Sequence, residues 1–189
     1  KNSFLDTARR VIRLEANALE LLADGIGDPF AQAVQLILDA PGRIIICGMG
    51  KSGHVARKIA ATFASTGTPA HFVHPAEASH GDLGMMTEGD VALVLSNSGE
   101  TPELADVIAH TRRFGIPMIG VASNAKSTLL SQSDVAIVLP AAEEACAPLA
   151  ASLGVLIEGA WKQYSQWKHD AHAMDFGDLV EQALKLLST

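Results

Sequence analysis

Residues 43–53, RIIICGMGKSG, decide the fold of this chain. The run RIIIC at residues 43–47 is short, continuous and apolar, which is typical of a parallel β-strand covered on both faces. Three glycines follow, and residues 52–66 then favour a helix. Glycine lets the backbone approach a ligand closely and adopt positive φ, and a helix N-terminus offers unpaired N–H donors with a partial positive charge. The stretch therefore predicts a strand–turn–helix unit whose turn suits a phosphate group.

Two nucleotide-binding motifs compete for this turn. The Walker A loop requires a glycine five residues before its Gly-Lys-Ser, and Ile45 occupies that position, so this motif is excluded. The dinucleotide fingerprint G-x-G-x-x-G is complete across residues 48–53. It also expects an acidic residue about 20 residues later, where the chain has His74 and Pro75, with Glu77 a few residues late. A dinucleotide site stays open as a weaker hypothesis, as does tight strand–helix packing without any ligand.

Short apolar runs alternate with helical segments on the C-terminal side of this stretch. Strands that alternate with helices imply βαβ units, a parallel sheet, right-handed crossovers and helices on both faces. The expected strands are residues 43–47, 69–73, 90–95, 117–121 and 135–139, and the expected helices between them are residues 52–66, 102–114 and 126–132. The sequence thus predicts an α/β fold with a five-stranded parallel sheet.

Helical segments precede and follow this core. Residues 3–24 place apolar side chains at helical spacings, and Asp28 is expected to cap a second helix that Pro29 begins. Beyond Pro140 the pattern is helical throughout, with helices expected over residues 149–167 and 175–187. We expect a single domain over residues 1–189, made of N-terminal helices at 1–40, the parallel core at 43–140 and C-terminal helices at 148–189.

The amino-acid composition limits the kinds of protein that this chain can be. The 189 residues are 48% apolar and 19% charged, which fits one folded domain. The net charge of −7 argues against a nucleic-acid partner but permits a small anion that is held by local donors. Two cysteines make neither a zinc site nor a disulfide framework, which favours a reducing, cytoplasmic location. The sequence contains no apolar stretch of 18 residues, so no membrane span is expected.

Broad apolar stripes on the first helix and on residues 149–167 predict a homo-oligomer.

A second polar turn follows the expected strand at residues 90–95. Its sequence is Ser96-Asn97-Ser98-Gly99-Glu100-Thr101, in which Thr101 is expected to cap the next helix and Pro102 to begin it. A cap uses one hydroxyl, so Ser96 and Ser98 are left to donate to phosphate oxygens. Both turns should lie at the carboxyl edge of the sheet, where ligands of such folds bind. A sugar phosphate, with a phosphate and a carbon chain to hold, uses two such turns better than a dinucleotide does.

Two stretches together resemble a known family. CGMGKSGHVARKIAATFASTGTPAHFVHPAEASHGDLGMM and LSNSGETPE are similar to the sugar isomerase (SIS) domain family, and within it to the bacterial arabinose-5-phosphate isomerases. The resemblance is dense from about Gly42 to Cys146 and covers the SIS domain alone, without CBS modules. It implies a flavodoxin-like αβα sandwich that interconverts D-ribulose 5-phosphate and D-arabinose 5-phosphate through an enediol. It also implies no organic cofactor, a dimer or tetramer, and a role in making the lipopolysaccharide sugar Kdo.

The resemblance also implies site residues. Aldose–ketose isomerisation needs a base near two adjacent carbons and a donor that stabilises charge on their oxygens. The side chains that match residues implicated in catalysis in the family are Lys51, His80, Glu103 and Glu144. The residues expected to bind the substrate and its phosphate are Gly50, Ser52, Ser96, Asn97, Ser98 and Thr101. His74, His80 and Asp82 lack standard zinc-ligand spacing, so no metal is expected.

The sequence departs from the family pattern after Cys146. A hydroxyl-rich family run is replaced by the shorter and mostly apolar residues 147–152, and the family's His-Pro-Gly-Gly turn has no counterpart. His169 and His172 are the only later histidines. Three functions therefore stay open: an isomerase, a sugar-phosphate-binding module without turnover and, more distantly, a dinucleotide-dependent oxidoreductase.

Overall fold

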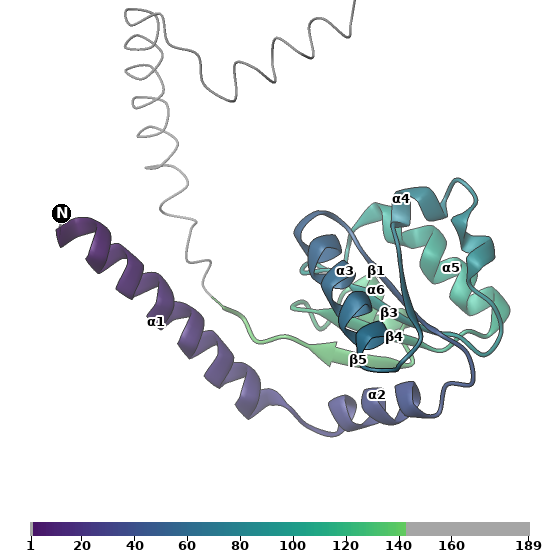
Figure 1. Ribbon diagram of the computed structural model, residues 1–189, viewed down its shortest axis with the longest axis horizontal. Helices are drawn as coiled ribbons and strands as arrows, with labels where there is room; N and C mark the ends of the chain where they lie inside the picture. The colour runs from purple at the N-terminus through teal and green to yellow at the C-terminus, as the bar shows by residue number, and fades with distance from the viewer. Residues whose placement is uncertain (1, 143–189) are drawn as a thin grey trace, which may run out of the picture. The chain divides into compact units, whose positions relative to one another are not determined.

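The computed structural model describes residues 2–142 (Figure 1). Residues 16–142 form one compact unit. The helices are α1 (Asn2–Gly25), α2 (Asp28–Leu38), α3 (Gly50–Ser65), α4 (Pro75–Ala78), α5 (Ala105–Phe114) and α6 (Thr128–Gln132), with 3-10 turns η1 (Asp82–Met85) and η2 (Pro102–Leu104). The strands are β1 (Ile44–Gly48), β2 (Ala70–Val73), β3 (Val91–Leu95), β4 (Met118–Ala122) and β5 (Val135–Val138). The helices expected at 149–167 and 175–187 lie outside the described residues, and the single-domain organisation stays a prediction.

The five strands form one parallel sheet in the order β2-β1-β3-β4-β5. This is the flavodoxin-like order rather than the 3-2-1-4-5-6 order of the dinucleotide-binding fold. The sheet confirms the predicted α/β class and all five expected strands, each to within two residues at its ends. Because β1 lies between β2 and β3 and is buried along its whole length, a continuous apolar run fits this strand.

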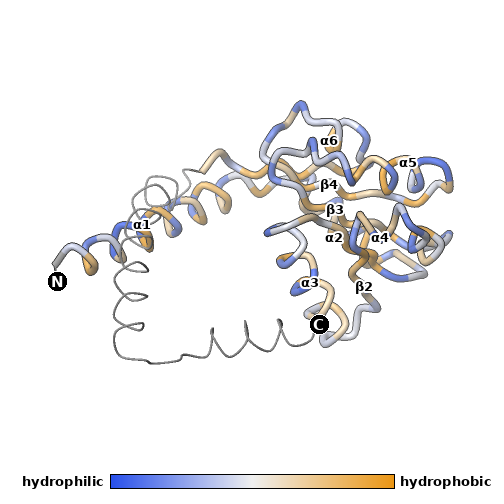
Figure 2. Tube along the Cα trace, turned by 90° about the horizontal axis from the view of Figure 1, so that it is seen from above, coloured by the Kyte–Doolittle hydropathy of each residue, from blue (hydrophilic) through white to orange (hydrophobic). Residues whose placement is uncertain are grey.

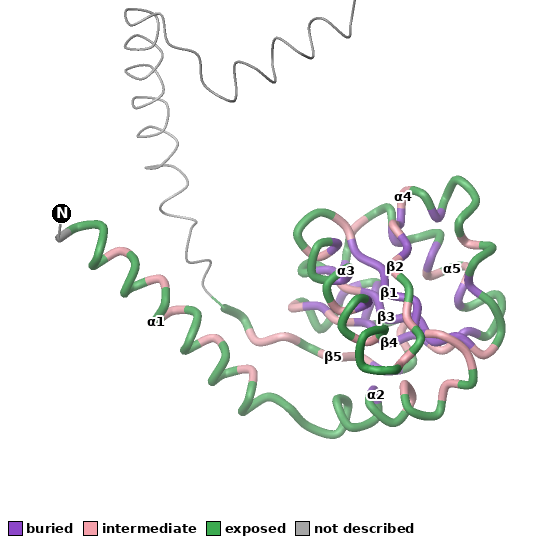
Figure 3. The backbone as a smooth tube through the Cα atoms, viewed as in Figure 1, coloured by how far each residue is buried: buried purple, intermediate pink, exposed green. Residues whose placement is uncertain are grey.

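Each face of the sheet has its own apolar core. One core joins β1 and β3 to Val107 of α5, Leu104 of η2 and Leu129 of α6. The other joins the same strands to Ala33 of α2 and to Ala56 and Ala60 of α3. Helices thus cover both faces, as Figure 1 shows for α3 and α5. Figure 2 shows the apolar strands between more polar helices and loops, and Figure 3 shows that the strands are the most buried part of the chain.

Some local predictions need correction. Gly27, with extended backbone, caps α2, so Asp28 is the first helical residue and not the cap. Gly27 has no side chain with which to cap the helix, and its carbonyl accepts the N–H of Phe30 at 3.0 Å as the first hydrogen bond of α2. The segment expected as one helix at 102–114 starts as the 3-10 turn η2. The short helix α4 and the turn η1 had no prediction, because four-residue elements leave no periodic pattern to detect.

The amino edge of the sheet, opposite the expected ligand edge, is held by Asp90. Its buried carboxylate accepts the backbone N–H of Arg43 at 2.8 Å, the Arg43 side chain at 3.0 Å and the N–H of Thr87 at 3.0 Å. Burial alone would raise the pKa of Asp90, but these hydrogen bonds and the Arg43 charge lower it overall. Asp90 therefore ties the entrances of β1 and β3 together and fixes their shared register.

No helix within residues 2–142 combines the length and hydrophobicity that crossing a bilayer requires.

Candidate active site

The first turn places the N-terminus of α3 directly against the end of β1. Gly50 has φ of +53°, which only glycine adopts without strain. A Cβ on Gly53 would lie 2.6 Å from the carbonyl oxygen of Gly48, and a Cβ on Gly48 would lie 2.9 Å from that of Ser52. Side chains at these two positions would push the helix away from the strand. The glycines therefore aim the first N–H groups of α3 at the space beyond the carboxyl edge of the sheet.

The second turn is shaped by its own hydroxyls. The Ser96 hydroxyl accepts the N–H of Gly99 at 3.0 Å and lies 2.8 Å from the Thr101 hydroxyl. Ser96 is only 5% exposed, so it supports the turn from inside. Thr101 makes no side-chain cap on η2, which corrects its predicted capping role. The Ser98 hydroxyl is exposed and accepts the N–H of Glu100 at 3.2 Å, leaving its own proton for an outside acceptor.

A third loop, residues 123–127 after β4, locks the second turn in place. Ser123 donates its N–H to the Asn97 carbonyl at 2.9 Å and its hydroxyl to the Asn97 side-chain oxygen. Glu100 accepts the N–H and hydroxyl of Thr128 at 2.7 and 2.8 Å, and these bonds lower the pKa of Glu100. No motif in the sequence had pointed to this loop. Its signal was another cluster of Ser, Asn and Lys immediately after a strand.

The sheet brings these turns side by side. Gly48 pairs with Leu95, and Leu95 pairs with Val121, so β1, β3 and β4 end together. The structure thereby confirms that both polar turns lie at the carboxyl edge. Lys51 is exposed in the first turn of α3, and Ser52 beside it is half-buried. Asn97 is exposed, and its amide nitrogen is not engaged in the hydrogen bonds that hold its oxygen.

Two further candidate residues lie on neighbouring segments. His80 is exposed just beyond α4, and its backbone N–H bonds the carbonyl of Glu77 at 2.9 Å. Glu103 is exposed within η2. Because α4 contacts η2, the structure brings the segments that hold these two side chains together. Glu144 lies outside the described residues.

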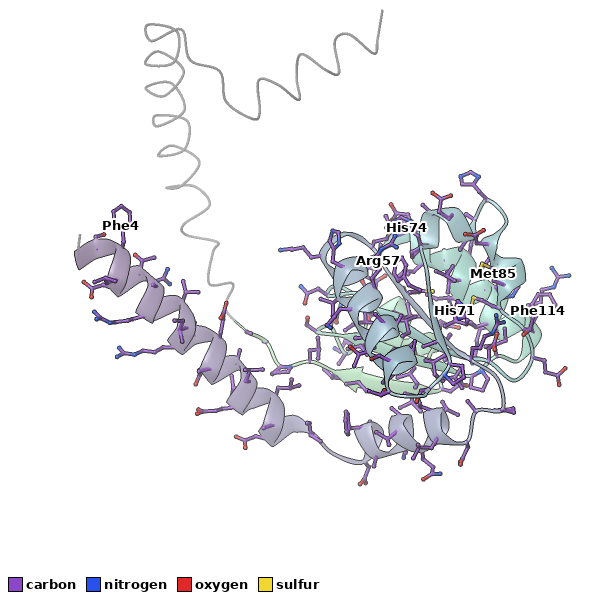
Figure 4. The ribbon with its side chains drawn as sticks, in the orientation of Figure 1. Phe4, Arg57, His71, His74, Met85 and Phe114 are labelled. Carbon is purple, nitrogen blue, oxygen red and sulfur yellow. The ribbon has the colours of Figure 1, made fainter. Side chains whose placement is uncertain are left out.

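His74 is a polar residue at this edge whose position the sequence did not foretell. It follows β2, its ring meets the Phe72 ring edge-on at 6.2 Å between centroids, and the Arg57 guanidinium lies 4.1 Å above that Phe72 ring. Figure 4 shows Arg57 and His74 on the same side of the molecule. Within residues 2–142, Nδ1 of His74 is the buried side-chain polar atom without a hydrogen-bond partner. Buried polar atoms without a partner are rare in folded proteins, and this one follows Val73, the β2 residue that pairs with Cys47 just before the first turn.

The described residues contain neither a cluster of metal-ligating side chains nor an exposed cysteine. Among residues 2–142, no three His, Cys, Asp or Glu side chains gather closely enough to hold a metal ion. Cys47 is fully buried within β1, and burial raises the pKa of its thiol to about 12. A thiol of that pKa is not a nucleophile near neutral pH. The polar groups that the described residues bring to this edge are hydroxyls, amides, carboxylates, imidazole and the Lys51 ammonium.

Comparison with known proteins gives consistent matches. Residues 36–157 match the model of the SIS domain. The chain is 47% identical to arabinose 5-phosphate isomerase KdsD of Pseudomonas aeruginosa over 82% of its own length, and 44% identical to that of Francisella tularensis over 83%. It spans about half the length of these curated relatives, 49% and 50% respectively. A solved structure of Escherichia coli CFT073 c3406 in complex with arabinose 5-phosphate is 36% identical, with a TM-score of 0.73 over 77% of each chain.

Proposed function

The chain belongs to the SIS domain family, and from that membership we propose that it isomerises D-ribulose 5-phosphate to D-arabinose 5-phosphate. The observation that carries the proposal is the pair of hydroxyl-rich turns at one sheet edge, fixed by the pairing of Gly48 with Leu95. Relatives named arabinose 5-phosphate isomerase and a neighbour bound to arabinose 5-phosphate support it. We propose further that the product supplies a lipopolysaccharide sugar such as Kdo and that the protein acts in the cytoplasm.

The substrate's phosphate binds between the two turns. The protein has a net charge of −7, so a dianion must be held by local donors and not by overall charge. These donors are the N–H groups that begin α3 at Gly50, the Ser52 side chain and the Ser98 hydroxyl. Thr101 supplies one more. When the Ser96 hydroxyl donates to the Thr101 hydroxyl, the Thr101 hydroxyl is left to donate to a phosphate oxygen. Ser96 therefore acts on the phosphate indirectly, by orienting Thr101.

The carbon chain then extends toward the catalytic side chains. A carboxylate removes a proton from C1 while the carbonyl oxygen on C2 gains one, which gives an enediol. The same group returns a proton to C2 as the C1 hydroxyl becomes the aldehyde. We assign Glu144 as this base and Lys51 as the cation that stabilises the enediolate oxygens. Glu103 and His80 are assigned to proton transfers on the sugar oxygens, including ring opening. Asn97 orients the substrate through its free amide nitrogen.

A second candidate function is a sugar-phosphate-binding module without turnover. One observation favours it: residues 147–152 are mostly apolar, and no His-Pro-Gly-Gly run occurs in the sequence. In the isomerase hypothesis, another group such as His169 or His172 replaces that histidine, or the reaction proceeds without it.

A single experiment separates these functions. Purified chain is mixed with ribulose 5-phosphate in deuterated water, and proton NMR follows the appearance of deuterated arabinose 5-phosphate. A thermal-shift screen of sugar phosphates and of NAD(P) runs alongside. Turnover that Glu144→Gln abolishes, with sugar-phosphate binding retained, supports the isomerase. Binding without turnover in the parent chain selects the binding module, and a shift with NAD(P) alone would overturn both.

A further inference from the structure

The side chain of His74 holds its two ring nitrogens in different surroundings. Nδ1 is buried and has no hydrogen-bond partner among residues 2–142. Nε2 also bonds to none of these residues, but it is not sealed in the same way, and the residue as a whole is partly exposed. The ring therefore lies with one nitrogen against the protein interior and the other at the surface of the carboxyl edge.

Side-chain contacts and the backbone both hold the ring in this position. The His74 ring meets the Phe72 ring edge-on, and the Arg57 guanidinium covers Phe72 at 4.1 Å. The backbone of His74 is extended, as the following Pro75 requires, and its carbonyl accepts the N–H of Ala78 at 2.9 Å. A ring that is fixed in advance loses little conformational entropy when it binds a ligand.

The burial of Nδ1 selects the tautomer of this ring. A neutral imidazole has one N–H donor and one acceptor nitrogen. A proton on Nδ1 of His74 would bury an N–H donor without a partner, which costs its full desolvation free energy. A proton on Nε2 stays at the surface and leaves only a lone pair inside. His74 is therefore held with Nε2 as the donor, facing the side on which ligands of this fold bind.

The order of the strands limits what Nε2 can reach. In the sheet, β2 lies beside β1 on the side away from β3. Val73 pairs with Cys47, so His74 follows beside Gly48, where the first turn begins. Neighbouring strands lie about 4.8 Å apart, and the first turn therefore stands between His74 and the second turn. A phosphate bound between the two turns is screened from His74, whereas a carbon chain that extends over β1 toward β2 is not.

Resting on the proposed function, we propose that the Nε2–H of His74 donates a hydrogen bond to an oxygen on the carbon chain of the bound pentose phosphate. The segment that begins at His74 continues through α4 to His80. The oxygen that His74 binds thus lies between the first turn and the segment that carries His80. His74 recognises the sugar part of the ligand, and the two turns recognise its phosphate.

The first test determines which nitrogen of His74 carries the proton. Histidines of the chain are labelled with nitrogen-15, and long-range proton–nitrogen NMR spectra are recorded at pH 8. The signals that disappear in His74→Gln belong to His74. We expect the proton on Nε2, and we expect arabinose 5-phosphate to shift the Nε2 signal. A proton on Nδ1 would overturn the proposal whether or not the chain is an isomerase.

The second test compares two amide side chains at position 74. Glutamine places an N–H donor near the position of Nε2, and asparagine places one near the position of Nδ1. In calorimetric titration with arabinose 5-phosphate, we expect His74→Asn to bind about three- to tenfold more weakly, the share of one neutral hydrogen bond, and His74→Gln to stay within about twofold of the parent. His71→Asn makes the same change at an exposed residue of β2 and is the matched control (Figure 4). Circular dichroism checks that all variants fold.

Inorganic phosphate separates this proposal from the assignment of the phosphate site. We expect Ser98→Ala to weaken the binding of inorganic phosphate and His74→Asn to leave it unchanged. Equal losses with asparagine and glutamine, a loss with inorganic phosphate, or no loss with His74→Asn would overturn the role of His74 and leave the isomerase proposal standing. A parent chain that binds no pentose phosphate would overturn the proposed function, and this proposal with it.

Discussion

Replacing Gly99 by alanine probes whether the second turn has the shape that phosphate binding needs. Gly99 has φ of +70°, where a side chain costs roughly 1–2 kcal/mol. A Cβ there would overlap the Oγ and Cβ of Ser127 and lie 3.2 Å from the Cβ of Ala122. Ser127 is fully buried and caps α6, so rotating its hydroxyl away cannot relieve the overlap. Such overpacking adds about 1–3 kcal/mol, which gives a total loss of about 2–5 kcal/mol in the free energy of unfolding.

The matched control is Gly50→Ala. Its φ is +53°, but a Cβ there would meet nothing within 4 Å, so only the backbone cost of roughly 1–2 kcal/mol applies. Urea denaturation of both variants measures the difference, and titration with arabinose 5-phosphate measures the turn's function. We expect Gly99→Ala to be the less stable variant and to bind at least about tenfold more weakly than the parent. If Gly99→Ala is as stable as Gly50→Ala and binds normally, the described packing of the turn is wrong.

Three further predictions concern groups that support the sheet and the second turn. Asp90→Asn should lower the free energy of unfolding by roughly 2–4 kcal/mol at pH 7. Because the pKa of Asp90 is lowered in the folded state, its contribution to stability is lost as the pH falls through that pKa. Urea denaturation should therefore show the difference in stability between Asp90→Asn and the parent closing below about pH 4. An unchanged gap in acid would refute this. Cys47, whose pKa is raised to about 12, should resist iodoacetamide at pH 8 and react only in denaturant, as peptide mass spectrometry would reveal; native labelling would contradict its burial. Glu100→Gln should speed hydrogen exchange at the Thr128 amide, whereas Glu88→Gln should not, and equal exchange in both would show that the Glu100 carboxylate does not hold that loop.

The sequence predicted the parts of the fold that repeat along the chain. The uninterrupted apolar run Ile44–Cys47 indicated a parallel strand covered on both faces, and the alternation of apolar runs with helical segments indicated five strands with helices between them. The glycines at 48, 50 and 53 indicated a turn that joins a strand to a helix, which β1 and α3 confirm. Each of these features is set by local periodicity or by backbone sterics, which a single sequence records.

The details of the site depended on contacts between distant residues, which a single sequence does not record. Ser96 was predicted to face a phosphate. Its hydroxyl instead points into the turn, because it accepts the backbone N–H of Gly99. Thr101 was predicted to cap a helix, but its hydroxyl lies on Ser96 instead. The hydrogen bonds between Glu100 and Thr128 join residues 28 positions apart, and no rule of sequence spacing predicts such a pair.

The most direct test of the site is a calorimetric titration of the parent chain and of Ser98→Ala with arabinose 5-phosphate and with arabinose. Ser65→Ala removes an exposed hydroxyl at the far end of α3 and serves as the matched control. Losing one donor to a charged acceptor costs about 1.5–3 kcal/mol, or roughly ten- to a hundredfold in affinity. We predict that loss for arabinose 5-phosphate with Ser98→Ala, no loss with Ser65→Ala and little change for arabinose. If Ser98→Ala binds arabinose 5-phosphate as tightly as the parent does, the phosphate is held elsewhere and the assignment of the two turns is wrong.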